Sequence, residues 1–582
     1  MKKTIAATVS ALAALALVLH LIGAEVPTRK PDSGQTRVKG ATRSNRADLP
    51  SREPFPGHAR VKLVIRDERG TPTGMRVRVT DPAGKYFAPL GHLSVTDRPA
   101  ANPGDLMLGD GVTYPRELHA LIYDGAEIDL PPGGYTIAAR KGFEYEPVEL
   151  PVAVTPAPHQ EIVIPLRRIA DYEARGWFPG DTHMHYPDAA GVRYEMECEG
   201  LRVCSLLVFK SGLPNPPVPG DGIFKNLASF TGKLSPVSDG RHFVKVGEEF
   251  RHNLLAHLIF QNLSDIVWPV STGGLPENGA GGFDWPLMYH AAGDARQQRA
   301  LVTWAHWPYP SMEAPLAIAL GKIDSLDLLT TGSPFEHHPI LVEVYKMKGP
   351  KAYVTPPIEM YYHYLNCGFR LAASSGSDKM NLHPPMGSAR TYVKTDGPLN
   401  YDSWIEGIRA GRTFVSNYPL LDLTVDGKIA GDTLRLKPGA TRLKVKASAR
   451  SIEPYDTLEI LVNGQVVASA KPSGPHYDAA LDETITVERG GWLAARAHGS
   501  KILPYGATWW KMPVFAHTSP IYLDMPGRPA PAAASAEILL DQLGYLERWA
   551  AEKASFPAPE NRAEALKLIG QARAIYEKLK AN

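Results

Sequence analysis

Residues 180–185, Gly-Asp-Thr-His-Met-His, constrain the fold of this chain more than any other segment. Side chains two residues apart on a β-strand point to the same face, so His183 and His185 can hold one metal ion together. An apolar pair, Trp177 and Phe178, precedes them, and a Tyr-Pro-Asp turn follows. The segment therefore predicts a strand that opens into a loop at the mouth of a barrel, with two metal ligands at its end.

Other polar residues follow stretches that read as buried strands. Residues 242–246 precede Glu248 and Glu249, residues 300–304 precede His306, and residues 371–374 precede Asp378, while His257 lies within an apolar run. Helix-like segments at 285–299 and 359–367 lie between these stretches. Alternating strands and helices predict a parallel sheet with crossover connections, in which side chains at successive strand ends converge on a divalent ion.

The order of these motifs resembles a known family. HMH, GEE, a downstream His, AHWP, YYHYLNCGFRLAASSGSD and GSARTYV, spread over residues 176–419, are similar to the CehA/McbA-type metallohydrolases, a secreted branch of the PHP (polymerase and histidinol phosphatase) superfamily. The resemblance implies a distorted (β/α)7 barrel that binds zinc, manganese or iron. It also implies that Glu249 is a bridging carboxylate and that the other ligands are His183, His185, His257, His306 and Asp378.

Two ligands of that family are missing from this chain. Where many PHP proteins carry Thr-Asp-His after the second strand, this chain has residues 205–210, Ser-Leu-Leu-Val-Phe-Lys, and after Asp378 it has Lys379-Met380 in place of the usual x-His. We therefore expect one or two ions per chain rather than three. His383 is close enough in sequence to substitute, but its Pro-rich surroundings favour an exposed loop.

Several site residues have a second interpretation. Glu249 is preferred to Glu248 only because it aligns with the family glutamate, and His257 lies among leucines, where a structural core histidine is nearly as well supported. Asp181 is expected to orient an imidazole ring. Four more residues could contact substrate, although structural or exposed positions explain them equally well: Lys210, His337, His338 and Arg390.

The N-terminus predicts export. Two lysines, an apolar run over residues 5–22 and the small pair Gly23-Ala24 make residues 1–24 a secretory signal peptide, with an uncleaved membrane anchor as the alternative. Residues 25–57 are polar and Pro-rich and are expected to be a flexible linker. The mature protein is thus expected to be periplasmic or secreted, without membrane contact beyond the signal segment.

Composition limits the class of protein and its partners. With 582 residues, of which 44% are hydrophobic and 21% charged, the chain is expected to form several globular domains. The net charge of +2 gives no reason to expect nucleic acid as a partner. Of the three cysteines, Cys198 and Cys204 form at most one disulfide, and Cys367 is expected to be a buried thiol.

The complete prediction is a multidomain protein with two β-sandwiches around a metal-binding barrel. Alternating strands predict a β-sandwich over residues 58–170, which resembles carboxypeptidase-regulatory domains, and another over residues 420–525 with a hairpin turn at Asn463-Gly464. The PHP-like distorted (β/α)7 barrel occupies residues 171–419 between them. Leucines at helical spacing predict a helical hairpin over residues 530–582 that docks on the protein itself.

The expected activity is hydrolysis. A divalent ion lowers the pKa of its water from about 16 to about 7, which makes a covalent nucleophile unnecessary. The sequence predicts an exported metal-dependent hydrolase that cleaves a phosphoester, ester, amide or carbamate bond of a small molecule, with Glu249 and Asp378 as catalytic residues. The alternative is a non-catalytic secreted protein with an eroded PHP site, whose sandwiches bind polysaccharide or a cell-surface component.

Overall fold

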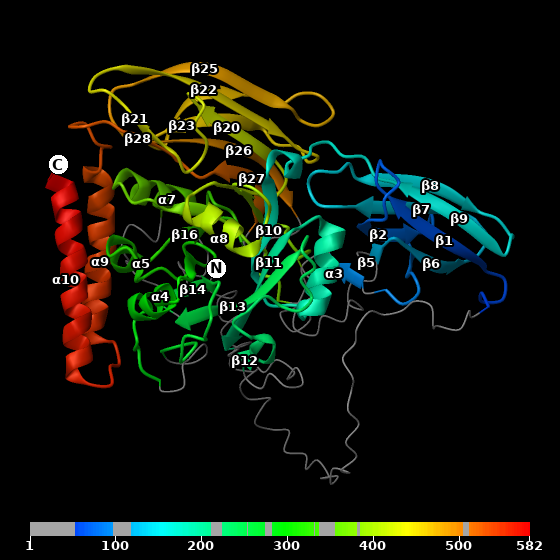
Figure 1. The fold of residues 1–582 in the computed structure, drawn as a ribbon, viewed down its shortest axis with the longest axis horizontal. Helices are drawn as coiled ribbons and strands as arrows, with labels where there is room; N and C mark the ends of the chain where they lie inside the picture. Colours follow the sequence, from blue (N-terminus) through cyan, green and yellow to red (C-terminus); the bar gives the residue numbers. More distant parts are fainter. Residues whose placement is uncertain are drawn as a thin grey trace, which may run out of the picture. The chain divides into compact units, whose positions relative to one another are not determined.

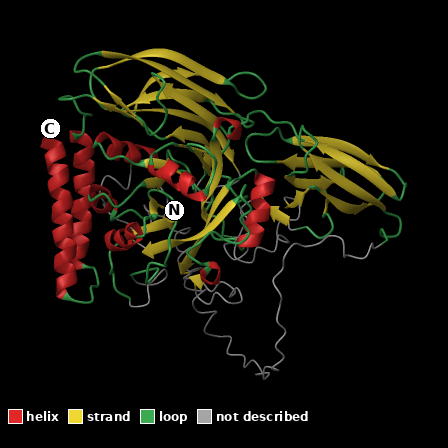
Figure 2. Cartoon of the chain, in the orientation of Figure 1, coloured by secondary structure: helices red, strands yellow, loops and turns green. Residues whose placement is uncertain are grey.

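The structure is a computed structural model that describes residues 53–92, 94–96, 118–210, 224–252, 254–273, 282–330, 332–336, 355–380, 384–503 and 511–581. The chain divides into two units, Met1–Glu53 and Pro54–Asn582, and every helix and strand described here belongs to the second. The predicted signal peptide, most of the predicted linker, and His337, His338 and His383 lie outside the described residues. The second unit is a multidomain, mostly β-sheet protein with few helices (Figure 2).

Two sheets with a common core form the N-terminal part of this unit. The first sheet has the order β6-β1-β9, and the second has the order β4-β5-β2-β7-β8 with β3 paired to β2. On β1 (Ala59–Arg66), Val61, Leu63 and Ile65 are buried and Lys62 is exposed, as expected for a strand with one face on a core. The remaining strands are β2 (Gly74–Thr80), β3 (Tyr86–Phe87), β4 (Ser94–Thr96), β5 (Leu118–Tyr123), β6 (Gly125–Leu130), β7 (Gly133–Arg140), β8 (Val148–Val154) and β9 (His159–Pro165).

A large curled sheet of 16 strands forms the centre of the molecule. Seven of its strands are neighbours in the order β17-β16-β15-β14-β13-β11-β10, and Figure 1 shows β10, β11 and β13 side by side. Their bounds are β10 (Trp177–Met184), β11 (Val203–Lys210), β13 (Phe243–His252), β14 (Ala256–Gln261), β15 (Leu301–Trp304), β16 (Ser325–Asp327) and β17 (Ala372–Ser374). A two-residue strand, β12 (Phe224–Lys225), pairs with the end of β11.

The sheet is not uniformly parallel, which corrects one expectation from the sequence. β14 runs antiparallel to both β13 and β15, whereas the pairs β10·β11, β11·β13, β15·β16 and β16·β17 are parallel. The link from β13 to β14 is too short for the helical crossover that parallel strands need, so a hairpin forms instead. β13 also continues to His252, so Glu248 and Glu249 lie within the strand and not after it.

The two ends of this seven-strand series meet. The backbone N–H of Asp378 donates to the carbonyl of His183 over 2.8 Å, and the N–H of His185 donates to the carbonyl of Lys379 over 3.0 Å. Met184 and Lys379 form a parallel β-bridge at the same place. The segment that follows β17 is therefore held against the end of β10, and the residues at both ends of the series share one site.

Helices cover the curled sheet. They are α3 (Ala189–Glu199), α4 (Met288–Gln297), α5 (Ala314–Ala319), α7 (Pro357–Asn366) and α8 (Tyr401–Arg409), and α4 and α7 lie within or close to the two predicted helical segments. The C-terminal helices α9 (Ala533–Glu552) and α10 (Pro559–Ala581) lie side by side (Figure 1). Leu539, Leu543 and Leu546 of α9 are buried in the same core as residues of α4, α5 and α7. The apolar stripe of the last two helices thus packs on the protein itself.

The C-terminal strands continue the curled sheet. From β10 the sheet runs on through β18, β19, β27, β26, β23 and β24, and a separate three-stranded sheet, β20-β22-β25, shares a core with it. The region predicted as a second β-sandwich therefore has one sheet in common with the central part, because β19 pairs with β27. The bounds are β18 (Arg390–Lys394), β19 (Thr413–Ser416), β20 (Leu420–Val425), β21 (Thr433–Arg435), β22 (Thr441–Arg450), β23 (Thr457–Val462), β24 (Gln465–Ala470), β25 (Ala479–Val487), β26 (Gly491–Leu503), β27 (Met512–Thr518) and β28 (Ile521–Asp524).

The hairpin predicted at Asn463-Gly464 is confirmed. β23 and β24 are antiparallel, and the two turn residues have φ angles of 51° and 84°. Both lie in the left-handed region that Asn and Gly tolerate best, which is the conformation that a type I′ turn requires.

Buried charges join the N-terminal sheets to the central sheet. Arg76 of β2 lies with its Nε 2.5 Å from Oε1 of Glu199, the last residue of α3, and both side chains are buried. Lys141, which follows β7, donates both to the carbonyl of Gly74 in β2 and to the carbonyl of Glu197 in α3. Cys198, Cys204 and Cys367 are all buried and free, so the disulfide allowed for Cys198 and Cys204 is not formed.

None of the helices in the described part of the chain is both long enough and apolar enough to cross a membrane.

Candidate metal centre

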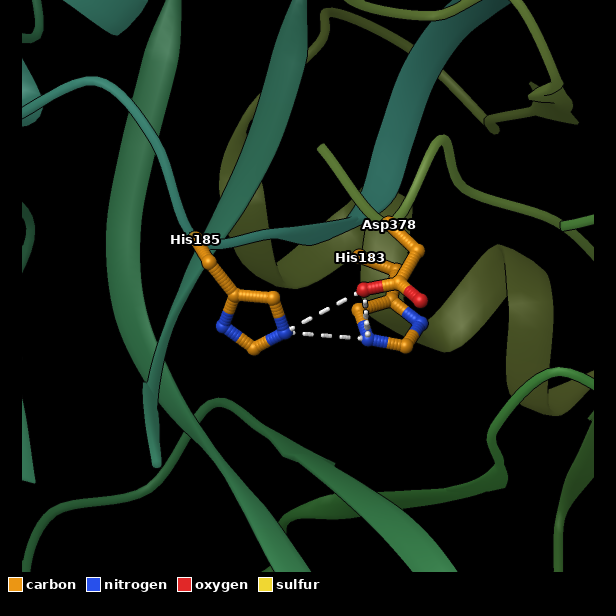
Figure 3. Close-up of side chains that lie close together, drawn as sticks. All are labelled: His183, His185 and Asp378. Atoms are coloured by element: carbon orange, nitrogen blue, oxygen red, sulfur yellow. Dashed lines mark hydrogen bonds and ion pairs between the residues drawn. The ribbon is translucent and has the colours of Figure 1, made fainter. Parts of the chain in front are cut away.

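The first group of potential ligands comprises His183, His185 and Asp378, whose side chains point toward one another (Figure 3). The two Nε2 atoms are 3.2 Å apart, and they lie 3.3 Å and 3.5 Å from Oδ1 of Asp378. Nitrogen and oxygen ligands about 2.0–2.1 Å from a tetrahedral zinc ion are about 3.3 Å from one another. The three atoms are therefore spaced as three corners of a coordination tetrahedron.

The second group comprises Glu249, His257 and His306. Nδ1 of His257 lies 3.0 Å from Nε2 of His306, and Oε1 of Glu249 lies 3.1 Å and 3.4 Å from these two nitrogens. These separations match those of the first group. His257, which the sequence left open between a core histidine and a ligand, lies with the other site residues.

Glu249 joins the two groups. Its Oε1 faces His257 and His306, while its Oε2 lies 3.1 Å from Nε2 of His185 and 3.7 Å from Nε2 of His183. One carboxylate thus offers one oxygen to each group. The first group has four donor atoms when Glu249 is included, and the second has three, which leaves a position for water at the second.

The neighbouring glutamate faces elsewhere. Successive side chains of a strand point to opposite faces. Glu248 accepts the backbone N–H of Val267 over 2.8 Å, and its burial raises its pKa well above the usual range. The structure places Glu249, and not Glu248, against the histidines.

Unpartnered atoms indicate that the site suits a cation. Glu249 Oε1 and Asp378 Oδ1 are buried and accept no hydrogen bond from the described residues. Buried carboxylate oxygens are normally hydrogen-bonded or coordinate a metal, because leaving them unpaired costs free energy. Two carboxylates and four imidazoles fit zinc, manganese or iron. The buried groups could hold a metal ion.

Charges inside the site shift the pKa values of the metal-free protein. Burial alone would lower the pKa of His183, but Asp378 and Glu249 raise it well above the usual range. Burial would raise the pKa of Asp378, but the nearby histidines, His183 first, lower it to about 2. Arg251 and His183 outweigh burial at Glu249 and hold its pKa well below the usual range. An ion that binds here must displace a proton from His183.

Asp181 holds the backbone and not an imidazole, which corrects the expectation from the sequence. Its Oδ1 accepts the N–H groups of His183 and Ser377, both over 3.0 Å, and its Oδ2 accepts the N–H of Gly387 over 2.8 Å. Between these segments, a Cβ on Gly376 would lie 2.4 Å from the backbone N of His183, so only glycine fits. Asp181 and Gly376 keep the Asp378 segment close to β10.

Two charged residues at the site were not predicted from the sequence. Arg251 donates from Nε to Oε2 of Glu249 over 2.9 Å. Asp327, the last residue of β16, lies with Oδ2 3.4 Å from Nδ1 of His183. Arg251 stands two residues after Glu249 and so shares its face of β13, which is the signal that could have indicated it.

The side chains of Lys379 and Arg390, two other residues considered from the sequence, contact groups other than the histidines. Lys379 is buried, donates to the carbonyl of Pro384 over 2.7 Å and lies 3.3 Å from Glu195. Arg390 is buried, donates to the carbonyls of Gly387 and Glu199, and stacks on Phe143. Lys210 ends β11, and partial burial lowers its pKa.

No protein-family model matches the chain, and comparison with curated proteins gives no significant match.

Proposed function

We propose that the protein is an exported, metal-dependent hydrolase of the PHP type. The motif order over residues 176–419 supports this, as does the arrangement of seven strands whose two ends meet at the histidines. A distorted barrel of the PHP kind, with its site where the strands end, would account for both. Export to the periplasm or outside the cell is part of the proposal and rests on residues 1–24.

The observation that carries the proposal is the division of the Glu249 carboxylate between two groups of ligands. Each of its oxygens lies within 3.1 Å of a histidine of a different group. A carboxylate that bridges two divalent ions is typical of centres that hydrolyse phosphoesters and related bonds. We therefore favour two ions per chain.

In such a centre, the residues of the chain would bind the ions, orient the substrate and exchange protons. When bound, the ions supply an activated water at neutral pH and polarise the bond that is attacked. His183, His185, His257 and His306 supply neutral nitrogen donors, and Glu249 balances charge between the two groups. Asp378 is the most exposed of these six side chains, at 15%, and its carboxylate would accept a proton from the attacking water.

A covalent cysteine mechanism has little support. Burial raises the pKa of the Cys367 thiol to about 12 and also raises those of Cys198 and Cys204, so all three stay protonated at neutral pH. We propose a small-molecule substrate with a phosphoester, ester, amide or carbamate bond. Polysaccharide or a cell-surface component is a second proposed partner for the β-sandwich regions.

A second candidate function is a secreted binding protein with a structural ion. The two missing family ligands favour it, because residues 205–210 carry no Asp-His pair and Met380 stands where the last His is expected. Asp378→Asn separates the two functions. For an enzyme, we expect turnover to fall about a hundredfold or more, with little change in melting temperature.

The first experiment is a substrate screen with nitrophenyl phosphate and naphthyl carbamate, using protein purified without chelator. Metal-dependent turnover of either compound, lost on chelation and in Asp378→Asn, supports the hydrolase. Metal binding without turnover of any phosphoester, ester, amide or carbamate, together with a lower melting temperature in Asp378→Asn, would favour the binding protein.

A further inference from the structure

Asp327 lies beneath the metal centre without belonging to either ligand group. It ends β16, between β15 and β17, and its side chain is fully buried. Its Oδ2 is 3.4 Å from Nδ1 of His183, whereas the atom of His183 that faces Asp378 and Glu249 is Nε2. The carboxylate therefore contacts the side of the imidazole ring that points away from the ligands.

Two backbone groups also donate to the side-chain carboxylate of Asp327. The N–H of His306 lies 3.4 Å from its Oδ2, and the N–H of Gly376 lies 3.3 Å from its Oδ1. His306 belongs to the second ligand group, and Gly376 is two residues before Asp378 of the first. One carboxylate thus contacts the strand ends that carry ligands of both groups.

The backbone at these strand ends is strained, so contacts from other residues must hold it in this conformation. His306 has a φ of 29° and Asp378 a φ of 48°, both in the left-handed region that residues with a side chain rarely adopt. Such conformations are unfavourable and persist only where surrounding contacts fix them. The hydrogen bond from His306 acts on one strained residue directly, and the one from Gly376 fixes the approach to the other.

We propose that Asp327 is a positioning residue for the metal centre, acting on both ion sites without binding an ion. This inference rests on the proposed function. Asp327 accepts the Nδ1 proton of His183, which leaves the lone pair of Nε2 free to bind an ion, and its backbone contacts hold His306 and Asp378 in their binding conformations. A carboxylate behind a metal-binding imidazole commonly sets its tautomer in this way.

Substitutions at Asp327 separate this role from simple packing. Asp327→Ala removes all three hydrogen bonds. Asp327→Asn keeps the shape of the side chain. In either orientation of the amide, its NH₂ group faces a backbone or ring N–H, so at least one hydrogen bond is replaced by two donors that face each other. A matched control is Glu313→Gln, which alters a different fully buried carboxylate that caps α4 through the N–H groups of Met288 and Tyr289.

The experiment measures zinc affinity by competition with a chelator, at a temperature where every variant is folded by circular dichroism. We expect Asp327→Ala to weaken binding at both sites about 10–100-fold, the usual effect of losing a carboxylate behind a ligand. X-ray absorption of the zinc-loaded variant should show fewer imidazole ligands per ion. Glu313→Gln should bind zinc as the wild type does.

The outcomes separate the positioning role from the proposed function. If the wild type binds no zinc, the proposed centre and the role of Asp327 in it are both overturned. If Asp327→Ala binds zinc as tightly as the wild type but has a lower melting temperature, Asp327 contributes to packing alone and the inference is overturned. Should the variants not fold, a crystal structure of the zinc-loaded wild type decides: a His183 Nδ1–Asp327 hydrogen bond supports the inference, and an Asp327 oxygen bound to zinc overturns it.

Discussion

Nε of Arg251 lies 2.9 Å from Oε2 of Glu249, the same oxygen that faces His183 and His185. The pair arises because residues two apart on β13 share a face. A cation at this position keeps the carboxylate ionised although it is fully buried. Arg251 therefore helps to keep a proton from competing with the ion for Glu249.

The first prediction follows from this contact. Without Arg251, burial would raise the pKa of Glu249, and the proton would compete with the ion over a wider pH range. Arg251→Met should therefore bind metal more weakly than the wild type, with a larger difference at pH 5 than at pH 8. Arg251→Lys keeps the charge and should lie between them. Equal pH profiles for all three proteins in metal-binding titrations would refute this role.

The second prediction concerns the two ligand groups. Because each has its own histidine pair, removing one pair should cost one ion and leave the other bound. His183→Ala with His185→Ala, and separately His257→Ala with His306→Ala, should each lower the metal content from two ions to one. His252→Ala is a suitable control, since His252 pairs with Asp284 outside the site. Loss of both ions in either double variant would show that the two sites do not fill independently.

The third prediction concerns pH and stability. Burial raises the pKa of Glu313 from 4.5 to about 8. A carboxyl with a higher pKa in the folded state binds more protons when folded, so the free energy of unfolding falls as the pH rises from about 4.5 to about 8. Glu313→Gln cannot ionise and should flatten this part of the profile. Denaturant unfolding at several pH values measures the free energy of unfolding. The same dependence on pH in Glu313→Gln as in the wild type would contradict the pKa shift.

The fourth prediction concerns the buried ion pair between Arg76 and Glu199. Removing one partner leaves the other charge buried without compensation, which typically costs about 3–5 kcal/mol. Arg76→Met alone should lower the free energy of unfolding by about this amount, and the double variant Arg76→Met with Glu199→Leu should recover most of it. Equal stability of the two variants would indicate that the ion pair contributes little.

Local motifs were enough to predict part of the fold and site. The His183–His185 pair lies on one face at a strand end, and Asn463-Gly464 forms its hairpin turn, because strand periodicity and turn conformation depend on neighbouring residues alone. The apolar stripe of the last helices likewise packs on the core.

What depends on strand pairing could not be read from the sequence. Glu248 and Glu249 point to opposite faces of β13, and only the placement of this strand in the sheet shows that Glu249 lies on the face of the histidines. β14 is antiparallel to β13 because a short hairpin joins them. Asp327 lies between two leucines with no partner nearby in sequence, so its contact with His183 appears only when β16 is placed in the sheet. The shared sheet between the central and C-terminal strands has the same origin.

The central claim is that Glu249 bridges two ions, and anomalous diffraction from crystals grown with manganese tests it most directly. The account predicts two peaks per chain, one on each side of the Glu249 carboxylate and about 3.5–4 Å apart. The peak nearer Asp378 should lie against His183 and His185, and the other against His257 and His306. A single peak, a third peak at the centre, or peaks away from Glu249 would contradict the account.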